Sequence, residues 1–245
     1  LIDHLAVFSA LHVGGGAEIV VRQLAEGLQD RGCDVTVLVT GPETGLHEEV
    51  HKGVRIYRAG LYNFYWHYTQ ARANPLLRLG WHYRDRYNRR MRQHVREVIA
   101  RERPDVVLCN NLTGWSISAW DEISAAGIPI VQVLHDLYLL CPKDTMFDKG
   151  RSCERQCGLC SAFRQRHAAA SAQVAAVIGV SRFILDKVSG HGYFGQACRH
   201  PNGPAGADGQ RDIQRRGRGI DRDRPFDGGD GRIVRVGQDV LDEFA

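Results

Sequence analysis

The stretch LAVFSALHVGGGAEIVVRQLAEGLQDRGCDVTVLVT, residues 5–40, decides the fold of this chain. It opens on an apolar strand at residues 5–9, continues into an amphipathic helix that begins near Ala17, and closes on a second apolar strand at residues 35–40. Gly32 follows the helix at the place where a left-handed residue ends one. The apolar face of the helix carries Val20, Leu24 and Leu28. The stretch therefore predicts a strand–helix–strand unit.

Three glycines, Gly14, Gly15 and Gly16, lie between the first strand and the helix. Glycine lets backbone N–H groups approach a ligand closely, and a helix N-terminus favours negative charge, so the run predicts a phosphate site. A tight turn with no ligand is the alternative. The run matches neither G-x-G-x-x-G nor a P-loop, and no lysine follows it.

Further apolar runs of strand length lie at residues 54–58, 105–109, 130–134 and 176–180. Most are continuous rather than alternating, as in parallel strands that helices cover on both faces. A second helix is predicted to carry Met91 and Val95 on its apolar side and to close before Pro104. This order indicates an α/β fold with a Rossmann-like, doubly wound parallel sheet.

Polar side chains follow two of these strands. Asn110 and Asn111 come after residues 105–109, and His135 and Asp136 come after residues 130–134. Ligands of such sheets bind beyond the carboxyl ends of the strands, so these residues and the glycine run predict one site. Asn111 alone could be a turn residue and His135 a packing residue. The position of His135 beside Asp136 at a strand end favours a function.

Four of the seven cysteines, Cys141, Cys153, Cys157 and Cys160, have the spacing C-x11-C-x3-C-x2-C. Thiolates close together in the chain favour zinc or iron–sulfur, and a cytoplasmic location disfavours stable disulfides. A structural zinc in this Cys-rich loop, residues 141–160, is the leading interpretation. Unligated thiols and a redox pair are the alternatives.

Composition and charge restrict the function classes. The chain has 245 residues, of which 43% are hydrophobic, and it contains no apolar run or leading segment typical of a membrane span or a signal peptide. A cytoplasmic protein is expected. Residues 72–103 carry ten arginines against three acidic residues. This excess predicts a solvated helix face, a surface for anionic lipid at the inner face of the membrane, or a surface for a phosphorylated substrate. Nucleic acid is disfavoured, because no reading motif accompanies the charge.

Four segments together resemble a known family: residues 8–40, PDVVLCNNLTGWS at 104–116, GIPIVQVLHDLYLLCPKDTMF at 127–147, and IGVSRFIL at 178–185. They are similar in sequence and order to the N-terminal domain of family 4 glycosyltransferases, in the branch with a Cys-rich loop after a His-Asp pair. The resemblance covers about residues 5–203. It implies one half of a GT-B fold, in which two Rossmann-like domains face each other across a cleft.

The resemblance also implies an activity. These enzymes transfer a hexose from a nucleotide-sugar donor to a glycan or lipid-linked acceptor with retention, as in polysaccharide biosynthesis. His135 would be the catalytic residue that contacts the transferred sugar. Independently of the resemblance, the aromatic side chains of residues 61–68 suit stacking on sugar rings, so this segment is predicted to flank the acceptor; packing under the long helix is the alternative. The matching donor- and acceptor-binding residues are Gly14, Gly15, Gly16, Asn111, Asp136, Ser181 and Arg182.

The end of the sequence departs from the family. Residues 198–245 contain nine arginines, nine glycines and nine acidic residues but no Lys, Ser, Thr, Tyr or Trp, which is typical of disorder. We therefore expect a domain at residues 1–197, followed by a linker and low-complexity remnant at 198–245. The second domain of the family is expected to be missing through truncation or frame disruption, and this chain alone is expected to have little activity. A non-catalytic acceptor- or glycan-binding module and a zinc-stabilised nucleotide-binding protein are the alternatives.

Overall fold

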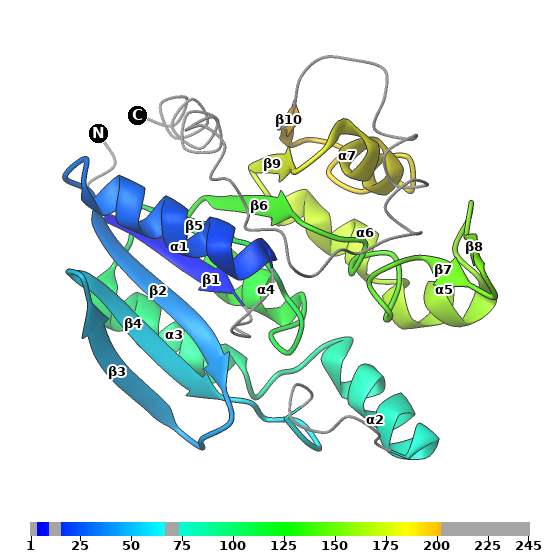
Figure 1. Cartoon of the computed structure of the whole chain (residues 1–245), viewed down its shortest axis with the longest axis horizontal. Helices are drawn as coiled ribbons and strands as arrows, with labels where there is room; N and C mark the ends of the chain where they lie inside the picture. The colour runs from blue at the N-terminus through cyan, green and yellow to red at the C-terminus, as the bar shows by residue number, and fades with distance from the viewer. Residues whose placement is uncertain (1–3, 10–15, 67–73, 202–245) are drawn as a thin grey trace, which may run out of the picture.

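The computed structural model describes residues 4–9, 16–66 and 74–201. They form an eight-stranded sheet in the order β10-β9-β6-β5-β1-β2-β4-β3 (Figure 1). The sheet strands are β1 (His4–Ser9), β2 (Asp34–Gly41), β3 (Leu46–His51), β4 (Val54–Gly60), β5 (Val106–Cys109), β6 (Ile130–Leu134), β9 (Ala176–Gly179) and β10 (Cys198–Pro201). All neighbours are parallel except β3, which is antiparallel to β4. The chain winds outward from β1 in both directions, which confirms the doubly wound α/β prediction.

Helices cover both faces of the sheet. They are α1 (Gly16–Gln29), α2 (Pro75–Asp85), α3 (Arg92–Glu102), α4 (Ser118–Ala125), α5 (Gly158–Arg164), α6 (His167–Ala170), the 3-10 helix η1 (Ser171–Gln173) and α7 (Arg182–Ser189). A short hairpin of β7 (Phe147–Asp148) and β8 (Arg151–Ser152) lies beside α5. The buried hydrophobic residues form two clusters. Helix α1 packs in one of them, and α3 and α4 pack in the other. The helix α1 lies in front of the sheet in Figure 1, whereas α3 and α4 lie behind it.

Strand β2 shows why continuous apolar runs predict this arrangement. Val35, Val37 and Val39 point to the α1 cluster, whereas Leu38 belongs to the cluster on the opposite face. Successive side chains of a strand point to opposite faces, so a strand between two helical layers is apolar throughout. Gly32 has φ +88° just after α1, and this conformation explains why glycine ends that helix.

The basic stretch differs from its prediction. It forms two helices, α2 and α3, separated by a turn in which tertiary bonds replace helical ones. The backbone N–H of Asn88 donates to Ser116 Oγ (2.7 Å), and its side-chain amide donates to Tyr62 O (3.0 Å). On α3, Arg92 and Arg96 both pair with Glu122 at 2.7 Å. Part of the basic surface is therefore an ion-paired helix face.

Four strands were not predicted. Strand β3 adds an antiparallel edge, β7 and β8 form the small hairpin, and β10 extends the sheet beside β9. Residues 202–245, and with them most of the predicted low-complexity remnant, lie outside the described residues. Among the described helices, none combines the length and the apolar character that crossing a bilayer requires.

Candidate functional site

The predicted site lies at the carboxyl edge of the sheet, where the parallel strands β1, β5, β6 and β9 end side by side. Of the glycine run, Gly14 and Gly15 lie outside the described residues, and Gly16 is the first residue of α1. The loops after β5 and β6 bring four predicted polar residues to this edge: Asn110, Asn111, His135 and Asp136.

His135 and Asn110 form the central contact of this edge. The His135 Nε2 atom lies 3.0 Å from Asn110 Oδ1, and the Asn110 amide nitrogen donates to Leu108 O at 3.4 Å. With the amide held in this way, its oxygen accepts the Nε2–H of His135, which leaves Nδ1 as the free acceptor. Burial lowers the pKa of His135 to about 4, so the imidazole is neutral at pH 7.

Asn111 and Asp136 turn back onto their own loops. Asn111 Oδ1 accepts from the backbone N–H of Thr113 (2.9 Å), and Asp136 Oδ1 accepts from that of Tyr138 (2.8 Å). Such bonds are typical of turns that aspartate and asparagine stabilise. Both side chains therefore shape the loops that position His135 and Asn110, whatever contacts they make with a ligand.

Ser181 and Arg182 extend the same edge at the end of β9. Ser181 is the N-cap of α7, and its Oγ accepts from the backbone N–H of Ile184 (3.3 Å). Arg182 is exposed as the first residue of that helix. The described residues around Asn110 and His135 enclose only about 10 Å³, room for about one water molecule.

The four cysteines do not form the predicted zinc site. The sulfur atoms of Cys141 and Cys160 are 3.7 Å apart. Within residues 4–9, 16–66 and 74–201, however, no group of three or more His, Cys, Asp or Glu side chains is placed to hold a metal ion. Cys157 is exposed and accepts the N–H of Cys160 as the N-cap of α5, and Cys153 packs against the core. The zinc prediction is not supported.

A buried polar network beside His135 was not predicted from the sequence. Arg164 is only 2% exposed. Its guanidinium carbon lies 4.1 Å from the centre of the Tyr138 ring, and its Nη1 atom lies 3.2 Å from His167 Nε2. Tyr138 donates its O–H to Asp85 Oδ2 (2.7 Å), and the backbone N–H of Gly114 donates to Oδ1 (2.7 Å). This network joins α2, α5 and the loops after β5 and β6, and so supports the His135 loop.

Burial changes the charges in this network. It raises the pKa of Asp85 to about 6, against the opposing effects of Arg164 and two hydrogen bonds. Burial and the neighbouring Asp136 raise the pKa of Asp144 to about 8. Burial and Arg164 lower the pKa of His167 to about 2, so its neutral ring can accept from the arginine. Arg164 therefore faces carboxyl groups that hold their protons unusually strongly.

We expect the raised pKa of Asp144 to make stability fall with pH. The folded state keeps a proton that the unfolded chain releases near pH 4, so the associated stability is complete below pH 4 and is lost as pH rises towards 8. In urea unfolding, the free energy of unfolding of the wild-type protein should decrease by about 1–2 kcal/mol between about pH 6.5 and 8 because of this group. The Asp144→Asn variant should lack this decrease.

Asparagine suits this position, because Asp144 has φ +64° and asparagine tolerates that conformation. The matched control is Asp148→Asn, which lies in the same loop but is exposed. It should keep the wild-type pH dependence. If the stability of Asp144→Asn decreased with pH as steeply as that of the wild-type protein, the pH dependence would not come from Asp144.

The sheet topology defines a fold class, an α/β domain of the type that forms the N-terminal half of GT-B glycosyltransferases. Residues 15–203 match the family described as "Glycosyl transferase 4-like domain", and the chain belongs to this family.

A relative from Klebsiella pneumoniae, "Uncharacterized 42.6 kDa protein in cps region", is 29% identical over 180 residues. That match covers 74% of this chain and 48% of the relative, so the chain spans about half the length of the curated relative it matches.

Solved structures support the fold. Sucrose-phosphate synthase from Thermosynechococcus elongatus is similar with a TM-score of 0.56 and 16% identity, over 82% of this chain and 48% of that one. A second structure carrying the same protein name matches with a TM-score of 0.51 and 13% identity, over 99% of both chains. At these identities the likeness concerns the fold alone.

Proposed function

We propose that this chain supplies the acceptor-side wall of a sugar-transfer cleft in a retaining glycosyltransferase. The donor would be a nucleotide sugar, the transferred group a hexose, and the acceptor a glycan or lipid-linked glycan of polysaccharide synthesis. The observation that carries the proposal is the neutral His135, held by Asn110 at the carboxyl edge of a family 4-type sheet. Sites of open α/β sheets lie at this edge.

The chemistry fits this geometry. When the bond between sugar and nucleotide breaks, negative charge grows on the departing phosphate, and helix N-termini and cations stabilise it. In the described residues, α1 begins at Gly16 and α7 begins at Arg182, both at this edge. The neutral imidazole of His135 offers Nδ1 to a sugar hydroxyl without adding a charge that would hold the phosphate back.

The site needs a second wall. A hollow of about 10 Å³ cannot enclose a sugar nucleotide, since ligand pockets measure about 300–1,000 Å³. We propose that a second domain, as in GT-B enzymes, completes the cleft and that this chain alone turns over little. Positioning two reactants supplies much of such a rate, and one wall cannot do it.

The proposal is tested by transfer from radiolabelled UDP-glucose, UDP-galactose, UDP-N-acetylglucosamine and GDP-mannose to bacterial lipid and polysaccharide extracts. We compare the chain alone with its residues 1–203 joined to the part of the Klebsiella relative that the match does not cover. The joined protein should transfer label from at least one donor, and the chain alone should not. Efficient transfer by the chain alone would refute the need for a second wall.

The alternative, a non-catalytic acceptor-binding module, is favoured by one observation, a separate cavity of about 490 Å³ beside the Cys-rich loop. If the joined protein bound acceptor extracts but released no nucleoside diphosphate from any donor, this alternative would replace the enzyme.

A further inference from the structure

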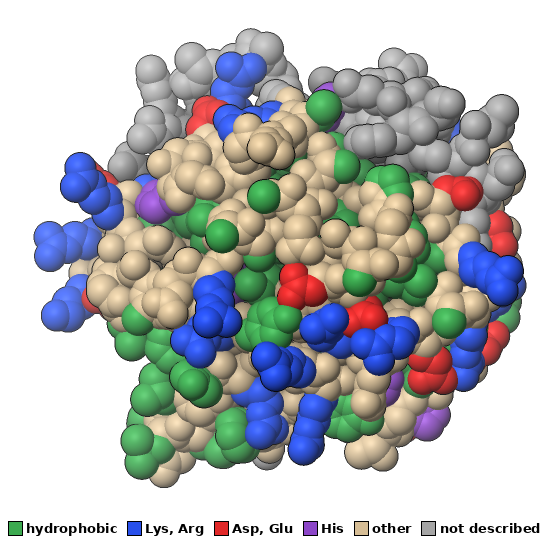
Figure 2. All heavy atoms as spheres, turned by 180° about the vertical axis from the view of Figure 1, so that it is seen from behind, with side chains coloured by type: hydrophobic (Ala, Val, Ile, Leu, Met, Phe, Trp, Pro, Cys, Tyr) green, Lys and Arg blue, Asp and Glu red, His purple; other side chains and the backbone are tan. Residues whose placement is uncertain are grey.

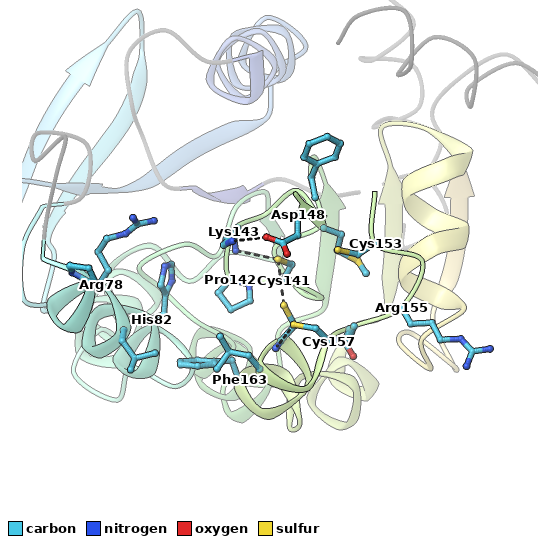
Figure 3. A pocket seen from close by; sticks show the side chains of 17 residues that line it. Arg78, His82, Cys141, Pro142, Lys143, Asp148, Cys153, Arg155, Cys157 and Phe163 are labelled. Carbon is cyan, nitrogen blue, oxygen red and sulfur yellow. Dashed lines mark hydrogen bonds and ion pairs between the residues drawn. The ribbon is translucent and has the colours of Figure 1, made fainter. Parts of the chain in front are cut away.

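A second hollow, separate from the residues around His135, lies between α2 and the Cys-rich loop (Figure 3). Its volume of about 490 Å³ is within the range of pockets for small ligands. Helix α2 follows β4, and the Cys-rich loop follows β6, so both walls leave the sheet at its carboxyl edge. Both walls therefore follow carboxyl ends of parallel strands, as the His135 loop does.

The inner wall of the pocket is apolar. Phe163 and Met146 are buried there, and Leu79 lines it from α2. Apolar side chains continue outward at the rim, where Phe147 is 53% exposed and Leu159 61% exposed. Exposed apolar side chains that border a hollow mark a binding surface rather than ordinary surface composition.

The same apolar character extends along α2. Three further side chains of this helix are exposed: Leu76, Leu77 and Tyr83. Figure 2 shows hydrophobic side chains gathered over α2 at the lower left of that face, beside a band of Lys and Arg. An apolar surface next to cations fits an amphiphilic, anionic ligand.

Cations line the pocket itself. Arg78 comes from α2, and Lys143 comes from the opposite wall. Lys143 lies 3.6 Å from Asp148, the acidic residue of the lining, and no described carboxylate lies within ion-pair distance of Arg78. His82 adds no charge at pH 7, because burial lowers its pKa to about 4. The lining therefore carries a net positive charge over an apolar wall.

The walls are held in place by bonds within the described chain. Trp81 Nε1 donates to Tyr65 O (3.1 Å), which fixes α2 against the preceding loop. Gln156 Nε2 donates to Leu140 O (2.8 Å), which closes the Cys-rich loop. A preformed pocket loses little conformational entropy on binding.

We propose that this pocket binds a phosphorylated long-chain lipid, with the hydrocarbon on the apolar wall and the phosphate at Arg78 and Lys143. The inference rests on the proposed function, since it identifies the acceptor of that site as carried on a lipid phosphate. A water-soluble glycan would gain nothing from the exposed Phe147 and Leu159. Inorganic phosphate would gain nothing from the buried wall.

Isothermal titration calorimetry with the 245-residue chain tests the pocket without any transfer assay. Farnesyl diphosphate, below its micelle concentration, should bind at one site. It should bind about 30-fold more tightly than inorganic diphosphate, because burial of a few methylenes contributes this much. It should also bind about 10-fold more tightly than dihexanoyl phosphatidylglycerol, whose phosphodiester carries less charge.

Variants locate the site. Leu79→Asp and Arg78→Glu should each weaken farnesyl diphosphate binding about 10-fold or more. Both positions lie on the surface of α2, so the fold should tolerate these changes. Val50→Asp, on the exposed edge strand β3, and Arg90→Glu, exposed but outside the pocket, are the matched controls and should change little.

Three results would overturn the inference. They are no saturable binding below about 1 mM, equal affinity for inorganic diphosphate or the phospholipid, and equal losses in the control variants. Failure here is separable from failure of the proposed function. Transfer to a soluble glycan without lipid binding would refute the pocket alone, and lipid binding without transfer would refute the enzyme alone.

Discussion

We expect replacement of Arg164 by leucine to lower the free energy of unfolding by about 3–5 kcal/mol at pH 8. The guanidinium is the buried positive charge that faces Asp85 and Asp144, and it also stacks on Tyr138. Without it, each carboxyl group must either be charged in an apolar environment or hold a proton at a pH above its pKa. Removal of one partner from a buried charge network is among the few single changes with costs this large.

The same reasoning predicts how the loss depends on pH. At pH 5, Asp85 and Asp144 are protonated in the folded protein, because both pKa values are raised above that pH. Neutral carboxyl groups need no compensating cation, so the cost of Arg164→Leu should be smaller at pH 5 than at pH 8.

Urea unfolding at the two pH values measures both effects. The control is Arg166→Leu, an exposed arginine two residues further along, which should change stability by less than about 0.5 kcal/mol. A cost for Arg164→Leu equal to that of the control, or larger at pH 5 than at pH 8, would show that the network does not hold the His135 loop.

We expect replacement of Asn110 by aspartate to raise the pKa of His135 from about 4 by about 1–3 pH units. The asparagine oxygen accepts the His135 Nε2–H at 3.0 Å, so a carboxylate there would stabilise the charged imidazolium directly. NMR titration of the His135 ring measures the shift. The readout needs no substrate, so it tests the geometry of the site independently of transfer.

The neighbouring residue provides the control. Asn111 bonds the backbone of Thr113 and no described atom of His135, so Asn111→Asp should move the His135 pKa much less. Asn110→Ala should leave the pKa low, because burial remains, and should release the ring from the Nε2–H tautomer. If Asn110→Asp and Asn111→Asp shifted the His135 pKa equally, each would act only through its added negative charge and not through a hydrogen bond to His135.

Strands covered on both faces were predictable from the sequence, because each reads as a continuous apolar run. Strand β3 was not, since its sequence LHEEVH is polar and exposed and it forms only by pairing with β4. The break between α2 and α3 also escaped prediction. It depends on Asn88, which bonds residues 26 and 28 positions away in the chain.

The site was predictable only in part. The ends of β5 and β6 identified Asn110, Asn111, His135 and Asp136 as neighbours, because parallel strands end at one edge. Which asparagine holds His135 depends on side-chain rotamers, and no spacing pattern encodes them. The Arg164 network escaped for a related reason, since the bond between Tyr138 and Asp85 joins residues 53 positions apart.

The cysteine spacing predicted more than the structure supports. The Cys160 thiol interacts with the thiols of both Cys141, 3.7 Å away, and Cys157. The described residues nevertheless contain no group of three or more His, Cys, Asp or Glu side chains that could hold a metal ion. The Cys-rich loop contributes a pocket wall instead.

The most direct test of the account is transfer by the joined protein with and without His135. If the reaction takes place at the edge of β5 and β6, His135→Ala should lower the transfer rate by about 10²-fold or more while leaving stability within about 1 kcal/mol. His47→Ala, on the exposed strand β3, should leave the rate unchanged. Equal rates for His135→Ala and His47→Ala, in a protein that does transfer sugar, would contradict the placement of the reaction at this site.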